Sequence, residues 1–134
     1  MLNAILITAA ILIIIGLLLV VNKMAITGLN KKYYEGRWKE IMNIVEQGST
    51  GARLSVIEAD KLLDHALKQK NFSGRTMADR MRSAKGQLKN ENSVWNAHKL
   101  RNRLVHEENV KLSTKQARSS LATYRSALKG LGAL

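Results

Sequence analysis

Residues 53–70 read RLSVIEADKLLDHALKQK, a stretch with the spacing of an amphipathic helix. Its apolar residues recur every three or four positions, which puts them on one side of a helix. They are Val56, Ala59, Leu63, Ala66 and Leu67. No proline interrupts this stretch or any other part of the chain. The pattern therefore predicts one helix that buries its apolar stripe against neighbouring helices.

Similar periods occur on both sides of this stretch. Four further helices are predicted, over residues 33–47, 76–89, 92–107 and 113–130. Gly48–Gly51 should separate the helix at 33–47 from the helix at 53–70, and residues 71–74 should form a turn after the latter. Thr76 and either Asn92 or Ser93 are suited to cap helix N-termini. The last helix should begin at Ser113 or Thr114. Because the connections are short, we expect an all-α fold with a four- to five-helix antiparallel bundle.

The N-terminal part has a different character. Residues 4–21, AILITAAILIIIGLLLVV, are apolar except for Thr8 and Gly16. As a helix this stretch would be about 27 Å long, close to the thickness of a bilayer core. The alternative is a cleaved signal peptide, but no basic residue precedes the run and no small-x-small site directly follows it. We therefore expect a transmembrane anchor at 1–26, a linker at 27–32 and a helical domain at 33–134.

Flanking charge predicts the orientation of this anchor. After the run, basic residues outnumber the two acidic residues, Glu35 and Glu40. The basic residues are Lys23, Lys31, Lys32, Arg37 and Lys39. The positive-inside rule then puts the N-terminus outside and the C-terminal domain in the cytoplasm, at the inner membrane. Tyr33, Tyr34 and Trp38 are either interfacial anchors or core residues.

The amino-acid composition excludes several kinds of catalytic and structural site. The chain has 134 residues, a net charge of +12 and no cysteine, which excludes disulfides and thiol catalysis. Its carboxylates are scattered among cations, so we expect no metal and no cofactor. Two basic runs are Lys68, Lys70, Arg75, Arg80, Arg82, Lys85 and Lys89, and Lys99, Arg101 and Arg103. Such runs suit RNA phosphates or the anionic lipid surface of the inner leaflet, unless they are simply a solvated surface.

The predicted helix at 92–107 carries two of the three histidines. His98, Asn102 and His106 are spaced by four residues and so share one face. Arg101 is one position away, within reach of that face. A guanidinium can hold phosphate oxygens, and a histidine can move a proton near neutral pH. The set could therefore act on a phosphodiester without a metal.

Arg101, Asn102 and His106 resemble the Arg-Asn-x-x-x-His signature of the HEPN superfamily. The wider pattern, with Asp60 and Asp64 on one helix and His98 on the next, is similar to small membrane-anchored helical proteins of uncharacterised bacteria. The resemblance covers roughly residues 53–128 and implies a helical bundle, often a metal-independent endoribonuclease.

The resemblance also implies roles. His106 would help to activate a ribose 2′-hydroxyl, Arg101 would stabilise the transition state, and Asn102 would position both. The products would carry 2′,3′-cyclic phosphate and 5′-hydroxyl ends. Lys99 and Arg103 would contact the RNA. Members of the superfamily usually build the site across a homodimer.

A structural role for the same residues stays open. Asp60 and Asp64 lie one turn apart and are supporting residues that could pair with Arg101 and His98 in the bundle. The domain would then be a non-catalytic module that binds RNA, lipid or protein. We expect Phe72 and Trp95 in the core, and His65 exposed on the polar side of its helix.

Overall fold

The computed structural model describes residues 1–25 and 28–134, with the side chains of 2–4 and 21–25 left out of the description. Six helices and no strand lie in this part of the chain, so the predicted all-α class is confirmed. The helices are α1 (Leu2–Ala25), α2 (Lys31–Ile44), α3 (Gly48–Gln69), α4 (Met77–Ser83), α5 (Glu91–His106) and α6 (Thr114–Gly130). The expected boundary between anchor and linker, with the side chain of Lys23, lies outside the described residues.

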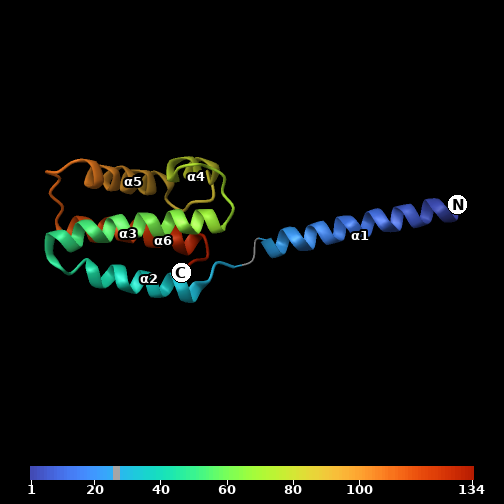
Figure 1. Ribbon diagram of the computed structural model, residues 1–134, viewed down its shortest axis with the longest axis horizontal. Coiled ribbons are helices and arrows are strands. Elements are labelled where there is room, and N and C mark those ends of the chain that lie inside the picture. Colours follow the sequence, from blue (N-terminus) through green and yellow to red (C-terminus); the bar gives the residue numbers. More distant parts are fainter. Residues whose placement is uncertain (26–27) are drawn as a thin grey trace.

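Helix α1 stands apart from the other five (Figure 1). The side chains of residues 5–20 are all exposed, and no contact with another helix occurs among the described residues of α1. Among the described residues, no helix combines the length and the apolar character needed to cross a bilayer.

Helix α3 is the centre of the bundle, since it packs against α2, α4, α5 and α6 (Figure 1). All five residues of its predicted stripe are fully buried: Val56, Ala59, Leu63, Ala66 and Leu67. The facing stripe of α6 is buried as well, with Ala117, Leu121, Tyr124 and Leu128. The antiparallel course of α3 and α5 brings the N-terminal end of α3 beside the C-terminal end of α5 (Figure 1).

The predicted break at Gly48–Gly51 is wrong, because α3 begins at Gly48 and continues through Gly51. Helix α2 ends earlier than expected, at Ile44. A Cβ atom on Gly51 would lie 2.1 Å from the carbonyl oxygen of Ile44, closer than any real contact. This glycine therefore lets two helix ends approach each other and does not interrupt the helix.

The cap of α4 is the one expected, and α6 begins at Thr114, one of its two expected starts, with Ser113 as the cap. Thr76 and Ser113 each form a capping box, with Asp79 and Gln116 three residues later. The cap of α5 was predicted wrongly. Asn90, with φ of 56°, precedes the helix in place of Asn92 or Ser93. The predicted helix at 76–89 is also shorter, because the chain turns after Ser83.

Two aromatic residues of α2 belong to the core. Tyr34 and Trp38 are only 1% and 8% exposed, whereas Tyr33 is 44% exposed. The expectation that His65 is exposed is wrong, because it is half-buried and its Nδ1 lies 2.8 Å from the Tyr34 hydroxyl. Burial, with the neighbouring Tyr33, raises the pKa of Tyr34 to about 12.

Phe72 and Trp95 are partly buried and pack against the core from its edge. The guanidinium of Arg82 lies over the Trp95 ring, 5.7 Å from its centre. Trp95 therefore joins the core to the basic surface of α4.

Candidate functional site

Asp60 of α3 lies at the centre of a buried polar cluster and is only 3% exposed. Its Oδ1 atom is 2.8 Å from Nδ1 of His98 and accepts a hydrogen bond from the Tyr124 hydroxyl at 2.9 Å. Its Oδ2 atom is 3.3 Å from Nε of Arg101. One carboxylate thus joins α3 to both α5 and α6. The pairing of Asp60 with His98 and Arg101, expected from the sequence, is present.

The contact between Arg101 and Asp60 is an ion pair without a hydrogen bond. Nε of Arg101 is buried close to the carboxylate, but it is not aligned to donate to any described residue. The attraction is therefore Coulombic. Nη1 of Arg101 donates instead to Oδ1 of Asn102, at 3.0 Å.

Asn102 links Arg101 to the histidine one turn earlier. Its Nδ2 atom lies 3.3 Å from Nε2 of His98. The Oδ1 atom of Asn102 accepts the hydrogen bond from Arg101, and its Nδ2 atom can only donate. Nε2 of His98 is therefore the acceptor of the hydrogen bond from Asn102. His98 then donates to Asp60 through Nδ1. The chain of donors runs from Arg101 through Asn102 and His98 to Asp60.

Tyr124 completes the cluster from α6. Burial, and then the negative charge of Asp60, raises the pKa of the phenol. The hydroxyl therefore stays protonated and donates to the carboxylate. With His98 and Tyr124 as donors and Arg101 as counter-ion, the buried charge of Asp60 is well satisfied.

An open pocket of about 400 Å³ lies above this cluster, between α3, α4 and α5. Five members of the predicted site line it: Asp60, Asp64, His98, Arg101 and Asn102. The other lining residues are Lys61, Thr76, Met77 and Ala78. Its walls carry both donors and acceptors. A pocket of this kind can hold a small polar or anionic group against the guanidinium of Arg101.

His106 does not line this pocket. It is the last residue of α5, is exposed, and forms no hydrogen bond or ion pair with any residue that the structure describes. Asn102 lies one turn before it on the same face of α5. His98 is the histidine that contacts the Arg101–Asn102 pair. The spacing by four residues predicted that His98, Asn102 and His106 share one face of the helix. His98 is buried on that face, whereas His106 is exposed to solvent.

Asp64 serves another cluster, contrary to the expected pairing with Arg101 or His98. Its two carboxylate oxygens lie 2.6 Å and 3.0 Å from Nε and Nη2 of Arg80, and Lys68 lies 3.0 Å away. Burial would raise the pKa of Asp64, but the hydrogen bonds from Arg80 and Lys68 outweigh it and lower the pKa. Nη1 of Arg80 also donates to the Gly74 carbonyl at 2.6 Å. This cluster fastens α4 to α3.

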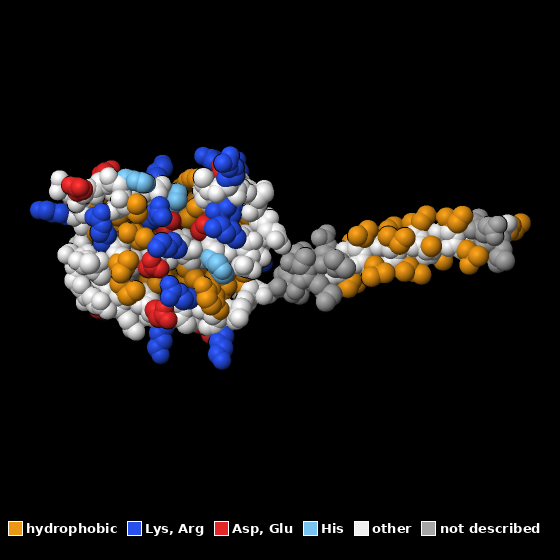
Figure 2. Space-filling model, in the orientation of Figure 1, with side chains coloured by type: hydrophobic (Ala, Val, Ile, Leu, Met, Phe, Trp, Pro, Cys, Tyr) orange, Lys and Arg blue, Asp and Glu red, His pale blue; other side chains and the backbone are white. Residues whose placement is uncertain are grey.

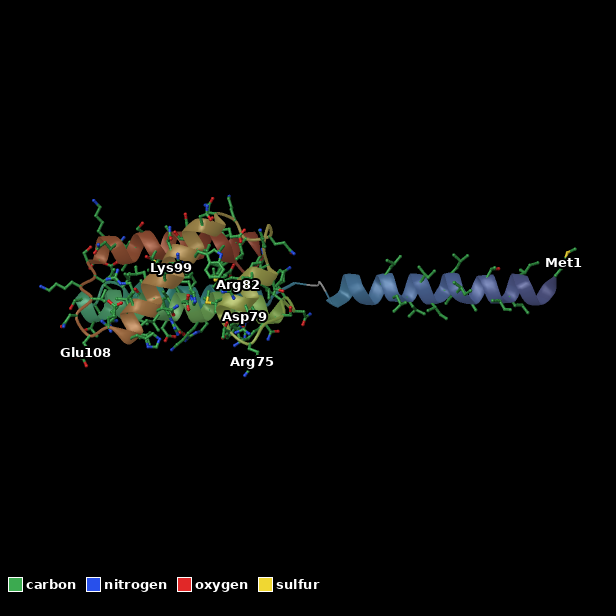
Figure 3. The ribbon with its side chains drawn as sticks, turned by 90° about the horizontal axis from the view of Figure 1, so that it is seen from above. Met1, Arg75, Asp79, Arg82, Lys99 and Glu108 are labelled. Carbon is green, nitrogen blue, oxygen red and sulfur yellow. The ribbon has the colours of Figure 1, made fainter. Side chains whose placement is uncertain are left out.

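Lys99 and Arg103 do not line the pocket either. Both are exposed, and Arg103 lies 3.4 Å from Glu107 of its own helix. Figure 3 shows Lys99 on the face viewed from above, between the α4 residue Arg82 and Glu108 at the opposite end. Figure 2 shows that blue side chains gather over α4. Lys99 and Arg103 therefore lie outside the pocket, and its two cationic lining residues are Lys61 and Arg101.

The chain matches no protein-family model, no curated protein and no solved structure with which it was compared. The likeness to the HEPN superfamily stays a prediction. It rests on Arg101, Asn102 and His106. In the described part of the chain, no group of three or more histidine, cysteine or acidic residues could hold a metal ion.

Proposed function

We propose that this chain is a membrane-anchored, HEPN-like helical domain that binds RNA phosphates at the Arg101–Asn102 pocket, on the cytoplasmic side of the inner membrane. Three features support the proposal: the apolar α1, the basic character of the domain, and the geometry of Arg101.

The anchor is supported by the exposure of α1. The mostly apolar side chains of residues 5–20 are exposed and have no partner in the described structure. Leaving such a surface in water is unfavourable, by about 25 cal/mol for each Å². The apolar run at 4–21 also extends beyond the side chains that the structure describes. A bilayer would cover it.

Phosphate binding is supported above all by the way Arg101 is held. Nε lies 3.3 Å from the Asp60 carboxylate in an ion pair, Nη1 donates to Asn102, and Nη2 donates to no described residue. The side chain is 24% exposed and lines the open pocket. A guanidinium fixed in this way can donate to a phosphate oxygen with little further loss of side-chain entropy. The net charge of +12 would draw a polyanion toward the domain.

RNA binding by the full chain in lipid nanodiscs tests this function. Arg101→Gln should weaken the binding of a labelled RNA at least several-fold and lower the salt dependence. The matched control is Arg118→Gln, which removes the same charge from an exposed ion pair with Glu46 on another face. Equal affinities for the two variants would contradict a specific role for Arg101.

Cleavage of RNA is the second candidate, and one observation favours it. His106 is exposed, unengaged among the described residues, and one turn from Asn102. It could move a proton if a second copy of the domain completed the site. Two apolar residues, Leu54 of α3 and Val105 of α5, are exposed. Each follows in sequence a residue of the hydrogen bond between the Arg53 side chain and the Leu104 carbonyl. They would suit a homodimer contact.

An RNase assay in EDTA distinguishes the two candidates. Cleavage to cyclic-phosphate ends by the full chain and none by His106→Ala would establish catalysis. Because His106 is exposed, this substitution should leave the fold intact, which thermal unfolding can check. Binding without cleavage would leave the non-catalytic domain.

A further inference from the structure

A groove between α2 and α6, on another part of the bundle, has the composition of an amphiphile site. It has a volume of about 680 Å³ and is lined by Glu35, Trp38, Lys39, Met42, Arg125, Lys129 and Leu134. We call it the α2–α6 groove. Neither the HEPN-like motif nor the Asp60 cluster contributes to it.

The floor of the α2–α6 groove is apolar. Trp38 belongs to the buried core, and Met42 and Leu134 are partly buried beside it. The pocket at Arg101 differs, because most of its lining residues are polar or charged. An apolar floor does not suit the ribose-phosphate backbone of RNA, but it suits an acyl chain.

The rim of the groove is cationic. Lys39 projects from α2 and Arg125 and Lys129 from α6, and all three are exposed. None of them forms an ion pair with another described residue. Glu35 is the one acid among the lining residues. Three unpaired cations above an apolar floor complement a molecule with an anionic head and an apolar tail.

The covalent connection to α1 keeps this groove near the end of that helix. Only residues 26–30 separate Ala25 from Lys31. Even a fully extended chain places Lys31 within about 20 Å of α1. Trp38 is seven residues further along α2, which adds about 10 Å. A groove held at this distance from an anchored helix lies within reach of the lipid headgroups.

We propose that the α2–α6 groove binds one anionic phospholipid of the bilayer. The phosphate lies between Lys39, Arg125 and Lys129, and the upper part of an acyl chain lies on Trp38, Met42 and Leu134. The inference rests on the proposed membrane anchor. It adds a defined lipid site to it, and it is independent of the RNA pocket at Arg101.

Fluorescence of Trp38 tests the proposal on the full chain. The chain has two tryptophans, so Trp95→Phe leaves Trp38 as the single emitter. This protein is reconstituted in nanodiscs of phosphatidylcholine with phosphatidylglycerol. Bromine atoms on the upper acyl carbons are placed on one lipid or the other. Brominated phosphatidylglycerol should quench Trp38 strongly, and brominated phosphatidylcholine at the same mole fraction should quench it much less.

Two double variants in the same background identify the site. Arg125→Gln with Lys129→Gln should remove most of the quenching by brominated phosphatidylglycerol. Lys111→Gln with Lys115→Gln removes the same charge near the opposite end of α6 and should leave the quenching unchanged. An equal loss in both double variants would mean general attraction to the surface and would overturn the proposal.

Other outcomes separate this inference from the proposed function. A chain that elutes with the discs without quenching of Trp38 overturns the lipid site alone. A chain that does not elute with the discs overturns the anchor and the lipid site together. Weaker RNA binding by the Arg125–Lys129 variant than by its control would assign the rim to RNA and overturn the lipid site.

Discussion

Nδ1 of His98 lies 2.8 Å from Oδ1 of Asp60, and this contact ties α5 to α3 below the pocket that Arg101 lines. The same carboxylate supports the architecture and sets the position of the candidate phosphate-binding group. Substitutions at Asp60 should therefore change both stability and binding.

Asp60→Asn should destabilise the domain by about 3 kcal/mol, because it leaves the Arg101 charge near a neutral amide in a largely buried site. Tyr124→Phe removes one hydrogen bond and should cost only about 1 kcal/mol. Urea unfolding of the two variants beside the wild type gives both values. A smaller effect for Asp60→Asn than for Tyr124→Phe would contradict the central place of the carboxylate.

Acid should weaken the attachment of α4. The folded-state pKa of Asp64 is lowered, so the unfolded chain takes up this proton first as the pH falls. The contribution of Asp64 is complete above the ordinary pKa of 3.8 and is lost as the pH falls through the lower folded value. Asp64→Asn should be less stable at neutral pH and lose less stability in acid. Unfolding midpoints at several pH values measure the difference, and parallel curves would contradict it.

Alkali should destabilise the domain through Tyr34. Its folded pKa is raised to about 12 from 10.0, so its contribution is complete below pH 10 and disappears as the pH approaches 12. Tyr34→Phe lacks this titration and should lose less stability as the pH rises from 10.0 to about 12. Tyr124 remains in both proteins, so the comparison isolates Tyr34. Equal losses in the two proteins would contradict the assignment.

Two glycines should respond in opposite ways to alanine. Gly51→Ala places a Cβ atom 2.1 Å from the Ile44 carbonyl oxygen, which α2 and α3 can relieve only by moving apart. Gly36 lies inside α2 with no atom within 4 Å of a new Cβ. Gly36→Ala should therefore stabilise the protein by about 0.5–1 kcal/mol. Thermal unfolding of both variants is the measurement, and a stable Gly51→Ala protein would contradict the close approach.

The helical periods predicted the core well, because every residue of the α3 and α6 stripes is buried. Thr76 was recognisable as a cap from its residue type, and its capping-box partner Asp79 follows three residues later. The role of Gly51 was predicted wrongly, because a glycine in a sequence usually indicates the end of a helix. Only the folded structure shows that Gly51 makes room for the Ile44 carbonyl at the end of α2. Asn90 was missed because its left-handed conformation depends on the preceding turn.

The candidate site was only partly predictable. The spacing by four residues correctly grouped His98, Asn102 and His106 on one helix face. It did not predict that His98 is buried in the bundle while His106 is exposed. Arg80 was counted with the basic surface, although it is buried against Asp64. Its place between Met77 and Met81 on the buried face of α4 was the signal that could have revealed it. Charge alone does not distinguish an exposed arginine from one that fastens two helices.

The central position of α3 has a consequence for synthesis. Its most extensive contacts are with α6, the last helix to be synthesised. The apolar face of α3 is therefore translated well before the helix that buries it. Until the segment at Leu121, Tyr124 and Leu128 leaves the ribosome, a nascent chain can pair α3 only with its earlier neighbours. An N-terminal helix already held by a membrane would keep this unfinished bundle in one place, away from other nascent chains. The order of elements would thereby protect the chain from aggregation while its last helix is made.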